Sequence, residues 1–233
     1  MASAQPRRPT YRYLTAVTAV FVTSLVTANI IAVKPIALGR LVVPAAVIIF
    51  PVSYIVGDVL TEVYGYAHAR RVIWIGFACN LLAVVAIALA GRLPAAPFWS
   101  DNDAAYATIL GGVPRVLAAS FGAYLVGEFL NAFVLARLKV LTRGRWLWSR
   151  TIGSTLVAQL ADSALFVAAA FAGVWPADQI APAIASQWLL KSAYEAAATP
   201  ATYAIVTFLK RAERQDHYDF DTSFNPFAIG PAD

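Results

Sequence analysis

Apolar residues occur in six long segments of this chain and not in the short alternating stretches that build a sheet. Each segment approaches or exceeds the ~20 residues that a helix needs to cross a bilayer. Because no alternation with a period of two is visible, spanning helices fit the pattern and a membrane barrel does not. We therefore predict an all-α membrane protein with six transmembrane helices. The six segments cover residues 13–33, 41–63, 72–90, 113–138, 151–175 and 181–209.

The composition points to the same class of protein. Of the 233 residues, 60% are hydrophobic and 13% are charged, whereas a soluble domain is about half apolar and about a quarter charged. The net charge of +5 is spread between the apolar segments and forms no basic patch with interleaved aromatics, so we expect no nucleic-acid partner. One cysteine and two distant histidines favour neither a disulfide nor a metal centre. We expect no cofactor.

Positive charges are dense in alternate links between the segments. Arginine and lysine gather before the first segment and after the second, fourth and sixth. The positive-inside rule places those links in the cytoplasm, so we expect an inner-membrane protein with both termini cytoplasmic. The first segment is too long for a signal peptide and five more follow it. We predict a cytoplasmic arm at 1–12, a membrane domain at 13–210 and a partly ordered cytoplasmic tail at 211–233.

Polar side chains recur at helical spacing inside the apolar segments. Residues three or four positions apart share one face of a helix, and a polar face turned toward lipid is costly. We therefore expect these faces to converge on the interior of the bundle. The candidates for substrate binding are Asn29, Tyr54, Gln159, Asp162, Phe166, Trp188, Lys191, Tyr194 and Glu195. The candidates for a gate or for proton coupling are Asp58, Glu62 and Glu128.

Helix packing is the competing interpretation of these polar residues. Hydrogen bonds between helices account for a threonine, a serine or a lone asparagine without any ligand. An ion pair with Arg70 or Arg71 would account equally well for Glu62, near the cytoplasmic end of its segment. Asp162, Lys191 and Glu195 lie near mid-helix, where no charge from a link reaches. A buried charge needs a partner or a function, and for these three we favour function.

Acidic residues outnumber basic ones among the interior candidates. Lys191 is the clear basic residue, and Lys34, at a helix end, could extend to the surface. Unpaired carboxylates in hydrocarbon must be protonated or meet a cationic or donor-rich ligand. The excess of carboxylates therefore favours a small polar molecule with several N–H donors over a lipid or an anion.

The run FPVSYIVGDVLTEVYGYAHARRVIW at 50–74 resembles the signature of the queuosine-precursor transporter family, first described as vitamin-uptake transporters. TANIIAVKPI in the first segment, STLVAQLADSALF in the fifth, and the region of Lys191 and Pro200 in the sixth support this resemblance. It implies uptake of 7-cyano-7-deazaguanine and its aminomethyl analogue. It also implies a bundle similar to the substrate-binding subunit of energy-coupling-factor transporters, working without the ATPase module.

The chemistry of a 7-deazaguanine agrees with the polar candidates. Its N1–H and exocyclic amine lie on one edge, and one carboxylate can accept both hydrogen bonds. We expect Asp162 or Glu195 to be that carboxylate. Asp58 and Glu62 are expected nearer the cytoplasm, as an inner gate or a proton-coupling pair. Candidates to donate to the ring carbonyl are Lys191, Asn29 and Gln159, and candidates to stack on the ring are Tyr54, Phe166, Tyr194 and Trp188.

Two other classes of function remain to be weighed. A substrate-binding subunit for another nucleobase or vitamin would need an ATPase partner. It would dock on small residues such as Ala118, Gly122 and Ala123, which equally suit helix packing or a homodimer. An intramembrane enzyme would need a nucleophile–base pair or metal ligands at helical spacing, such as HExxH, and the sequence contains none. We therefore expect a transporter of a small molecule in the lipid bilayer and not an enzyme.

Overall fold

The computed structural model describes residues 11–31, 34–38, 41–110, 114–173, 177–220 and 222–227. Within them most of the chain is helical, and one short hairpin is the exception among the regular elements, which confirms the predicted all-α membrane class. The elements in chain order are α1 (Leu14–Ile31), β1 (Pro35–Leu38), β2 (Leu41–Pro44), η1 (Ala45–Ile48), α2 (Phe50–Val59), η2 (Leu60–Tyr64), α3 (Tyr66–Ala90), η3 (Pro97–Asn102), α4 (Asp103–Leu110), α5 (Pro114–Leu141), α6 (Leu147–Phe171) and α7 (Ala177–Glu213).

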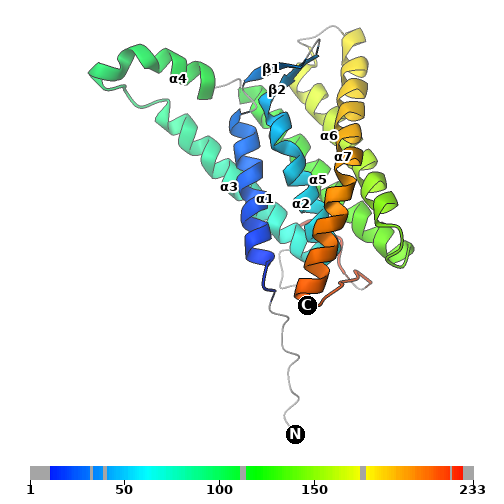
Figure 1. Cartoon of the computed structure of the whole chain (residues 1–233). Helices are drawn as coiled ribbons and strands as arrows, with labels where there is room; N and C mark the ends of the chain where they lie inside the picture. The colour runs from blue at the N-terminus through cyan, green and yellow to red at the C-terminus, as the bar shows by residue number, and fades with distance from the viewer. Residues whose placement is uncertain are drawn as a thin grey trace.

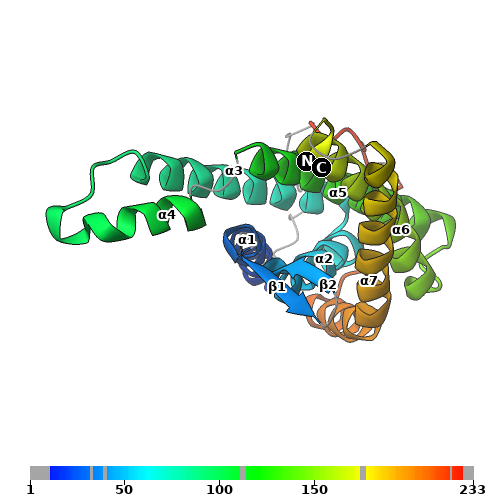
Figure 2. The same ribbon diagram turned by 90° about the horizontal axis from the view of Figure 1, so that it is seen from above.

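The long helices form a bundle in which α1 begins and α7 ends at the same end (Figure 1), called the basal end below. Helices α5 and α6 make the most extensive packing, and α7 lies against α6 and α2. Helix α3 starts at the basal end and leans away from the bundle, with α4 beyond its far end (Figure 2). The carboxylate of Glu213 ties the two termini of the bundle together, because the backbone N–H groups of Arg12 and Tyr13 donate to it at 2.8 and 2.7 Å.

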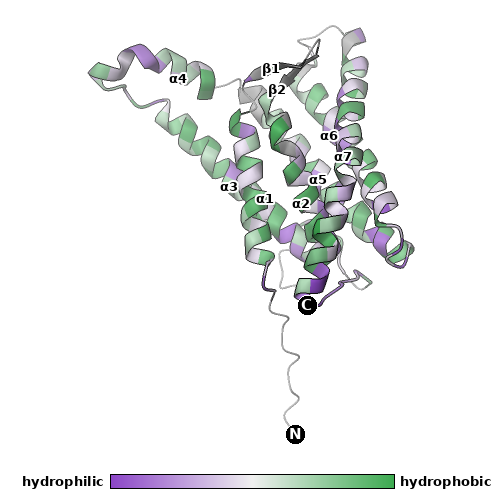
Figure 3. Cartoon of the chain, in the orientation of Figure 1, coloured by the Kyte–Doolittle hydropathy of each residue, from purple (hydrophilic) through white to green (hydrophobic). Residues whose placement is uncertain are grey.

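Four helices in the described part of the chain are long and apolar enough to cross a membrane. They are α1, α3, the stretch Ala118–Leu141 of α5 and the stretch Leu147–Ala170 of α6. Hydrophobic residues cover much of α1 and α3 (Figure 3). By length and composition the chain is therefore a multi-pass membrane protein. The count of six spans stays a prediction.

The predicted second segment, 41–63, is not one continuous helix. Its first residues form β2, which pairs antiparallel with β1, and α2 begins only at Phe50. Pro51 sits in the first turn of α2, where its missing N–H is not needed. The ten residues of α2 and the five of η2 reach about 22 Å at 1.5 Å per residue, short of the ~30 Å hydrocarbon core. The hairpin extends this segment at the end opposite the basal end (Figure 1).

A π-helical turn, η2, ends this short helix and contains Glu62. Such turns are rare and often occur at functional sites. Gly65 follows with a φ of 83°, a backbone conformation that glycine adopts without steric cost. Helix α3 begins at the next residue. The chain thus reverses direction over one residue and leaves Glu62 at the base of the bundle.

The described residues of the C-terminal tail after α7 pack across the basal end. The guanidinium of Arg70 donates to the carbonyls of Ser223 and Asn225 at 2.8 and 2.9 Å. The indole N–H of Trp74 donates to the carbonyl of Pro226 at 2.7 Å. These acceptors are backbone carbonyls, which every residue possesses. The sequence of the tail therefore carries no signal of this docking.

Replacing Arg70 with alanine should release the tail. The substitution removes two hydrogen bonds from a charged group, each worth about 1.5–3 kcal/mol. We expect chymotrypsin to cut the tail of the Arg70→Ala variant faster than that of the wild type, at Tyr218 or Phe220. Arg145→Ala, which changes an exposed arginine of the α5–α6 connection, is the matched control. Equal cutting of all three proteins would contradict the docking.

Candidate functional site

The carboxylate of Glu62 is fully buried and is held by three cations from three helices. Arg150, at the start of α6, donates to both carboxylate oxygens at 2.9 and 3.2 Å. Lys210 of α7 donates to Oε1 at 2.6 Å. The ammonium of Lys139 on α5 lies 3.6 Å from Oε1 and donates to the backbone carbonyl of Glu62 at 2.6 Å. We call these four residues the basal charge cluster.

The tail supplies a second carboxylate to the basal charge cluster. Asp216 accepts hydrogen bonds from Lys139 at 2.7 Å and from Lys210 at 2.8 Å. Burial alone would raise the pKa of Asp216, but the hydrogen bonds from the two lysines lower it below its ordinary value. Lys139 also donates to the backbone carbonyl of His217. Three cations thus face two carboxylates, and the tail closes the basal end over them.

Cations other than Arg70, one of the two partners that the competing interpretation offered, hold Glu62. The cations that hold Glu62 come from α5, α6 and α7, while Arg70 binds the tail. Lys139 and Arg150 belong to the positively charged link after the fourth apolar segment, yet both side chains are almost completely buried. For Lys139 a signal was present, because it stands between Leu138 and Val140 inside an apolar run.

Four buried carboxylates from four helices face the middle of the bundle. Glu128 on α5 is close enough to interact electrostatically with Asp58 on α2 and Asp162 on α6. Glu195 on α7 interacts with Asp58 and Glu128. The hydroxyl of Tyr54 interacts with three of them, Asp162, Glu128 and Glu195. The structure therefore brings together the acidic candidates that the sequence placed on separate helices. We call these four carboxylates and Tyr54 the acidic cluster.

Some carboxylate oxygens of the acidic cluster accept no hydrogen bond from a described residue. Asn131 donates to Oδ1 of Asp58 at 2.7 Å. Neither Oδ2 of Asp58 nor Oε1 of Glu195 accepts a hydrogen bond from a described residue. The hydroxyl of Tyr124 on α5 lies beside the carboxylate of Glu128 and can donate to it. A buried acceptor without a donor costs about 1–3 kcal/mol. The cluster therefore favours a ligand that brings N–H donors.

Asp162 differs from the other carboxylates because it has a cationic partner. The ammonium of Lys191 on α7 forms a short ion pair with its Oδ2. Lys191 is about a quarter exposed and Asp162 is buried, so the pair lies at the edge of the acidic cluster. The pair offers an acceptor and a donor side by side, which a lone carboxylate cannot do.

Gly57 makes the close approach of α2 and α5 possible. A Cβ atom at Gly57 would lie 2.1 Å from Oε1 of Glu128, far closer than two atoms can pack. The carboxylate of Glu128 therefore rests directly on the backbone of α2. Any side chain at position 57 would displace it from the acidic cluster.

The other predicted binding residues fall into different surroundings. Gln159 is buried on α6, and its Oε1 accepts no hydrogen bond from a described residue. Phe166 is half-buried, one turn after Asp162. The indole N–H of Trp188 donates to the carbonyl of Leu156 at 3.0 Å, which joins α7 to α6. The side chain of Tyr194 is 45% exposed, so it lies on the outside of the bundle.

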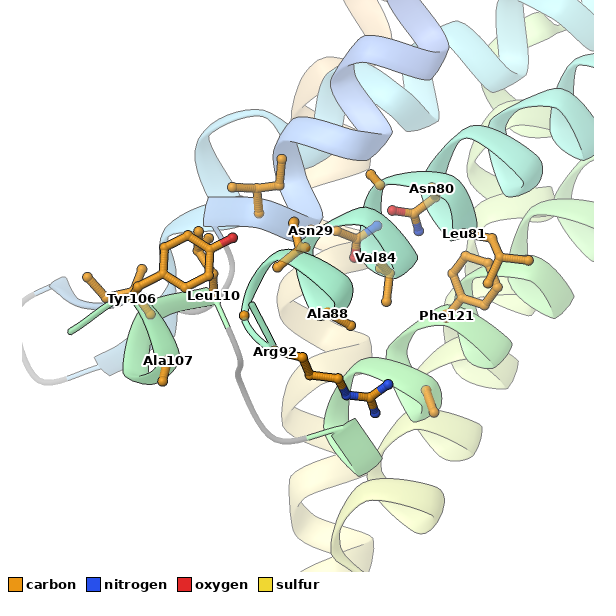
Figure 4. Close-up of a pocket in the computed structure, with 16 residues that line it drawn as sticks. Asn29, Asn80, Leu81, Val84, Ala88, Arg92, Tyr106, Ala107, Leu110 and Phe121 are labelled. Atoms are coloured by element: carbon orange, nitrogen blue, oxygen red, sulfur yellow. The ribbon is translucent and has the colours of Figure 1, made fainter. Parts of the chain in front are cut away.

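Asn29 lies away from the acidic cluster. It lines a cavity of about 460 Å³ between α1, α3, α4 and α5, together with Asn80, Arg92 and Tyr106 (Figure 4). None of the residues that line this cavity belongs to the acidic cluster. The structure therefore separates Asn29 from the carboxylates with which the sequence grouped it.

A membrane bundle whose interior carboxylates converge from several helices is typical of a carrier for a small polar solute. The comparisons with known proteins agree. The family described as "Putative vitamin uptake transporter" matches residues 44–205, and the chain belongs to this family. It is 34% identical over 191 residues to the "Probable queuosine precursor transporter" of Bacillus subtilis (strain 168), which covers 81% of this chain and 82% of that protein.

Membership of this family identifies a membrane transporter and not an enzyme. It confirms the resemblance carried by the run at 50–74. No solved structure matches the chain. The predicted similarity to the binding subunits of energy-coupling-factor transporters therefore stays a prediction.

The basal charge cluster should stabilise the fold as one coupled unit. Glu62→Gln leaves buried cations without their shared anion, and we expect the free energy of unfolding to fall by about 3 kcal/mol. Chemical unfolding of the protein in detergent measures this. Adding Arg150→Met should cost less than the sum of the two single substitutions, because contacting residues do not act independently. Asp178→Asn, at an exposed position of α7, is the control. Strict additivity would show that the two charges are not coupled.

Proposed function

We propose that this protein imports queuosine precursors, 7-cyano-7-deazaguanine and its aminomethyl analogue, across the inner membrane. One observation carries the proposal: the acidic cluster presents buried acceptors without donors, on Asp58 and Glu195. A 7-deazaguanine carries N1–H and an exocyclic amine on one edge, which is the complement of those acceptors. The printed name of the Bacillus subtilis relative points to the same class of cargo.

In this proposal the ion pair of Asp162 and Lys191 recognises the hydrogen-bonding edge of the base. The carboxylate accepts from N1–H and the amine, and the ammonium donates to the neighbouring ring carbonyl. Glu195, with an open oxygen, is the second candidate for reading the edge. Tyr54 lies beside both carboxylates and offers an aromatic surface to the bicyclic ring. Adenine lacks the N1–H and the carbonyl, so it would leave buried groups unpaired and be rejected.

The proposed topology has six spans: α1, α2 with η2, α3, α5, α6 and α7. Helix α7 has 37 residues, about 55 Å at 1.5 Å per residue, which is more than a bilayer requires. Lys191 and Glu195 lower its apolar character without reducing its length. The basal end holds Lys139, Arg150 and Lys210, and the positive-inside rule assigns that end to the cytoplasm. Both termini are then cytoplasmic.

Asp58, Glu62 and Glu128 are proposed to gate and couple transport. Asp58 belongs to the acidic cluster, and Glu62 lies one turn further toward the basal end. Opening this end would require Glu62 to part from its cations. Protonation of Asp58 or Glu128, which lie within electrostatic range of each other, would reduce their repulsion and link occupancy of the site to the proton gradient.

A partner protein would have a face on which to dock. A Cβ atom added at Gly122 of α5 would meet nothing within 4 Å among the described residues. Small exposed residues permit close helix–helix contact. A second copy of the chain would fit this face, and so would an ATPase module of the alternative in which the chain is a binding subunit. Copurification of an ATPase would favour that alternative.

Direct binding to the purified protein tests the substrate class. We expect 7-cyano-7-deazaguanine to bind more tightly than adenine, which the acidic cluster rejects, and Asp162→Asn or Glu195→Gln to weaken this tight binding at least about tenfold, which is about 1.4 kcal/mol. Isothermal titration in detergent measures this, with guanine as a further competitor. Asp178→Asn, an exposed carboxylate on the same helix as Glu195, should bind like the wild type. Failure of the wild type to bind any deazapurine would overturn the proposal.

Proton coupling is tested separately in proteoliposomes, where no enzyme can trap the substrate. With an inward proton gradient the wild type should concentrate 7-cyano-7-deazaguanine, and a protonophore should reduce uptake to equilibration. Glu128→Gln removes one titratable group of the acidic cluster, so its uptake should equilibrate and ignore the protonophore. If the wild type also ignores the protonophore, transport is facilitated diffusion and the coupling role is wrong.

A further inference from the structure

The cavity between α1, α3, α4 and α5 has the features of a small-molecule site (Figure 4). Its volume of about 460 Å³ falls in the ~300–1,000 Å³ range of such pockets, which are mostly apolar with a few placed polar groups. Here the apolar lining comes from aliphatic residues together with Phe121 and Tyr106, and two carboxamides interrupt it. Arg92 is the only charged group among the lining residues that the structure describes.

Asn80 is the unusual residue of this cavity. It lies in the middle of α3 and is only 3% exposed, yet its side chain forms no hydrogen bond with another described residue. Its carboxamide lines the cavity and can hydrogen-bond a ligand there. Asn29 on α1 lines the same cavity. Its amide donates to the carbonyl of Leu25 at 3.2 Å, and its oxygen stays available to a ligand.

A carboxamide recognises a planar lactam or amidine by two parallel hydrogen bonds. Its oxygen accepts from a ring N–H or an amine, and its NH₂ donates to a ring carbonyl or ring nitrogen. Because it carries both a donor and an acceptor, it pairs with a guanine-type edge and also with an adenine-type edge. A carboxylate, which only accepts, cannot do this. The two polar regions of the bundle should therefore differ in selectivity.

We infer that this cavity is an outer binding site for a neutral planar nucleobase, read by Asn80 and Asn29 and less selective than the acidic cluster. This inference depends on the proposed function in one respect: the proposed function is the reason why 7-cyano-7-deazaguanine is included among the bases expected to bind. The hairpin end of α1 and the far half of α3 place the cavity opposite the basal charge cluster (Figure 1). The base would occupy it before reaching the acidic cluster. Arg92 disfavours a cationic ligand there, so the cyano precursor should bind better than the aminomethyl one.

Protection of a cysteine inside the cavity tests this. In a Cys79→Ser background, which removes the single native cysteine, Ala88→Cys places a thiol in the cavity wall. Leu89→Cys is the matched control, since Leu89 is the next residue, is 55% exposed and does not line the cavity. Both variants are labelled with N-ethylmaleimide in detergent, with and without 7-cyano-7-deazaguanine or adenine.

We expect either base to slow labelling of the cysteine at 88 and not of that at 89. At about ten times its dissociation constant a base leaves about a tenth of the sites free, so labelling should slow about tenfold. Protection should survive Asp162→Asn and disappear in Asn80→Leu. Val84→Trp, which fills the cavity and keeps Asn80, should also remove binding at this site, which guards against a misfolded Asn80→Leu protein.

The outcomes separate this site from the proposed function. If the wild type binds 7-cyano-7-deazaguanine through Asp162 while labelling at 88 is unchanged, the outer site is wrong and the proposed function stands. Protection that vanishes with Asp162→Asn would also overturn it, because one inner site would then explain both results. If both bases protect position 88 but neither is taken up, the outer site stands and the proposed function fails.

Discussion

Glu62 draws its cations from α5, α6 and α7, and none of them is near it in sequence: Lys139, Arg150 and Lys210 are 77, 88 and 148 positions away. Removing a carboxylate from water costs several kcal/mol unless paired charges and hydrogen bonds compensate. The basal end of the bundle therefore has to close with all three helices in place. The π-turn and Gly65 aim the carboxylate at that meeting point, and Asp216 of the tail balances part of the remaining positive charge.

The acidic cluster has the opposite character, although it lies only a turn or so away along α2. Its carboxylates repel one another, and some of its oxygens have no donor among the described residues. A bundle with a saturated charge cluster at one end can hold such a site, because the saturated end keeps the helices together. Close packing at Gly57 brings the carboxylate of Glu128 directly against α2. Stability and recognition are thus divided between two neighbouring groups of charges.

Three kinds of polar side chain occupy successive levels of the bundle, from the outer cavity to the basal end. Neutral carboxamides line the outer cavity, carboxylates occupy the middle, and cations close the basal end. In the proposed transport cycle a neutral base would meet weak, permissive hydrogen bonds first and selective, charge-assisted ones second. The cations would then form the final barrier. Under this proposal, each group of charges inside so apolar a chain has a role in transport.

The sequence by itself determined the membrane class, most helices, the family and the convergence of Tyr54, Glu128, Asp162 and Glu195. The class, the helices and the convergence follow from the periodicity of the helix and from the cost of turning a polar face toward lipid, which are local properties. The family follows from the resemblance of the run at 50–74. Only the tertiary structure decided that a hairpin precedes α2, that the tail docks by its carbonyls and which cations hold Glu62. The same structure separated Asn29 from the carboxylates and left Tyr194 on the outside. Contacts between residues far apart in the chain depend on how the helices pack, and the spacing of residues within one helix does not specify that packing.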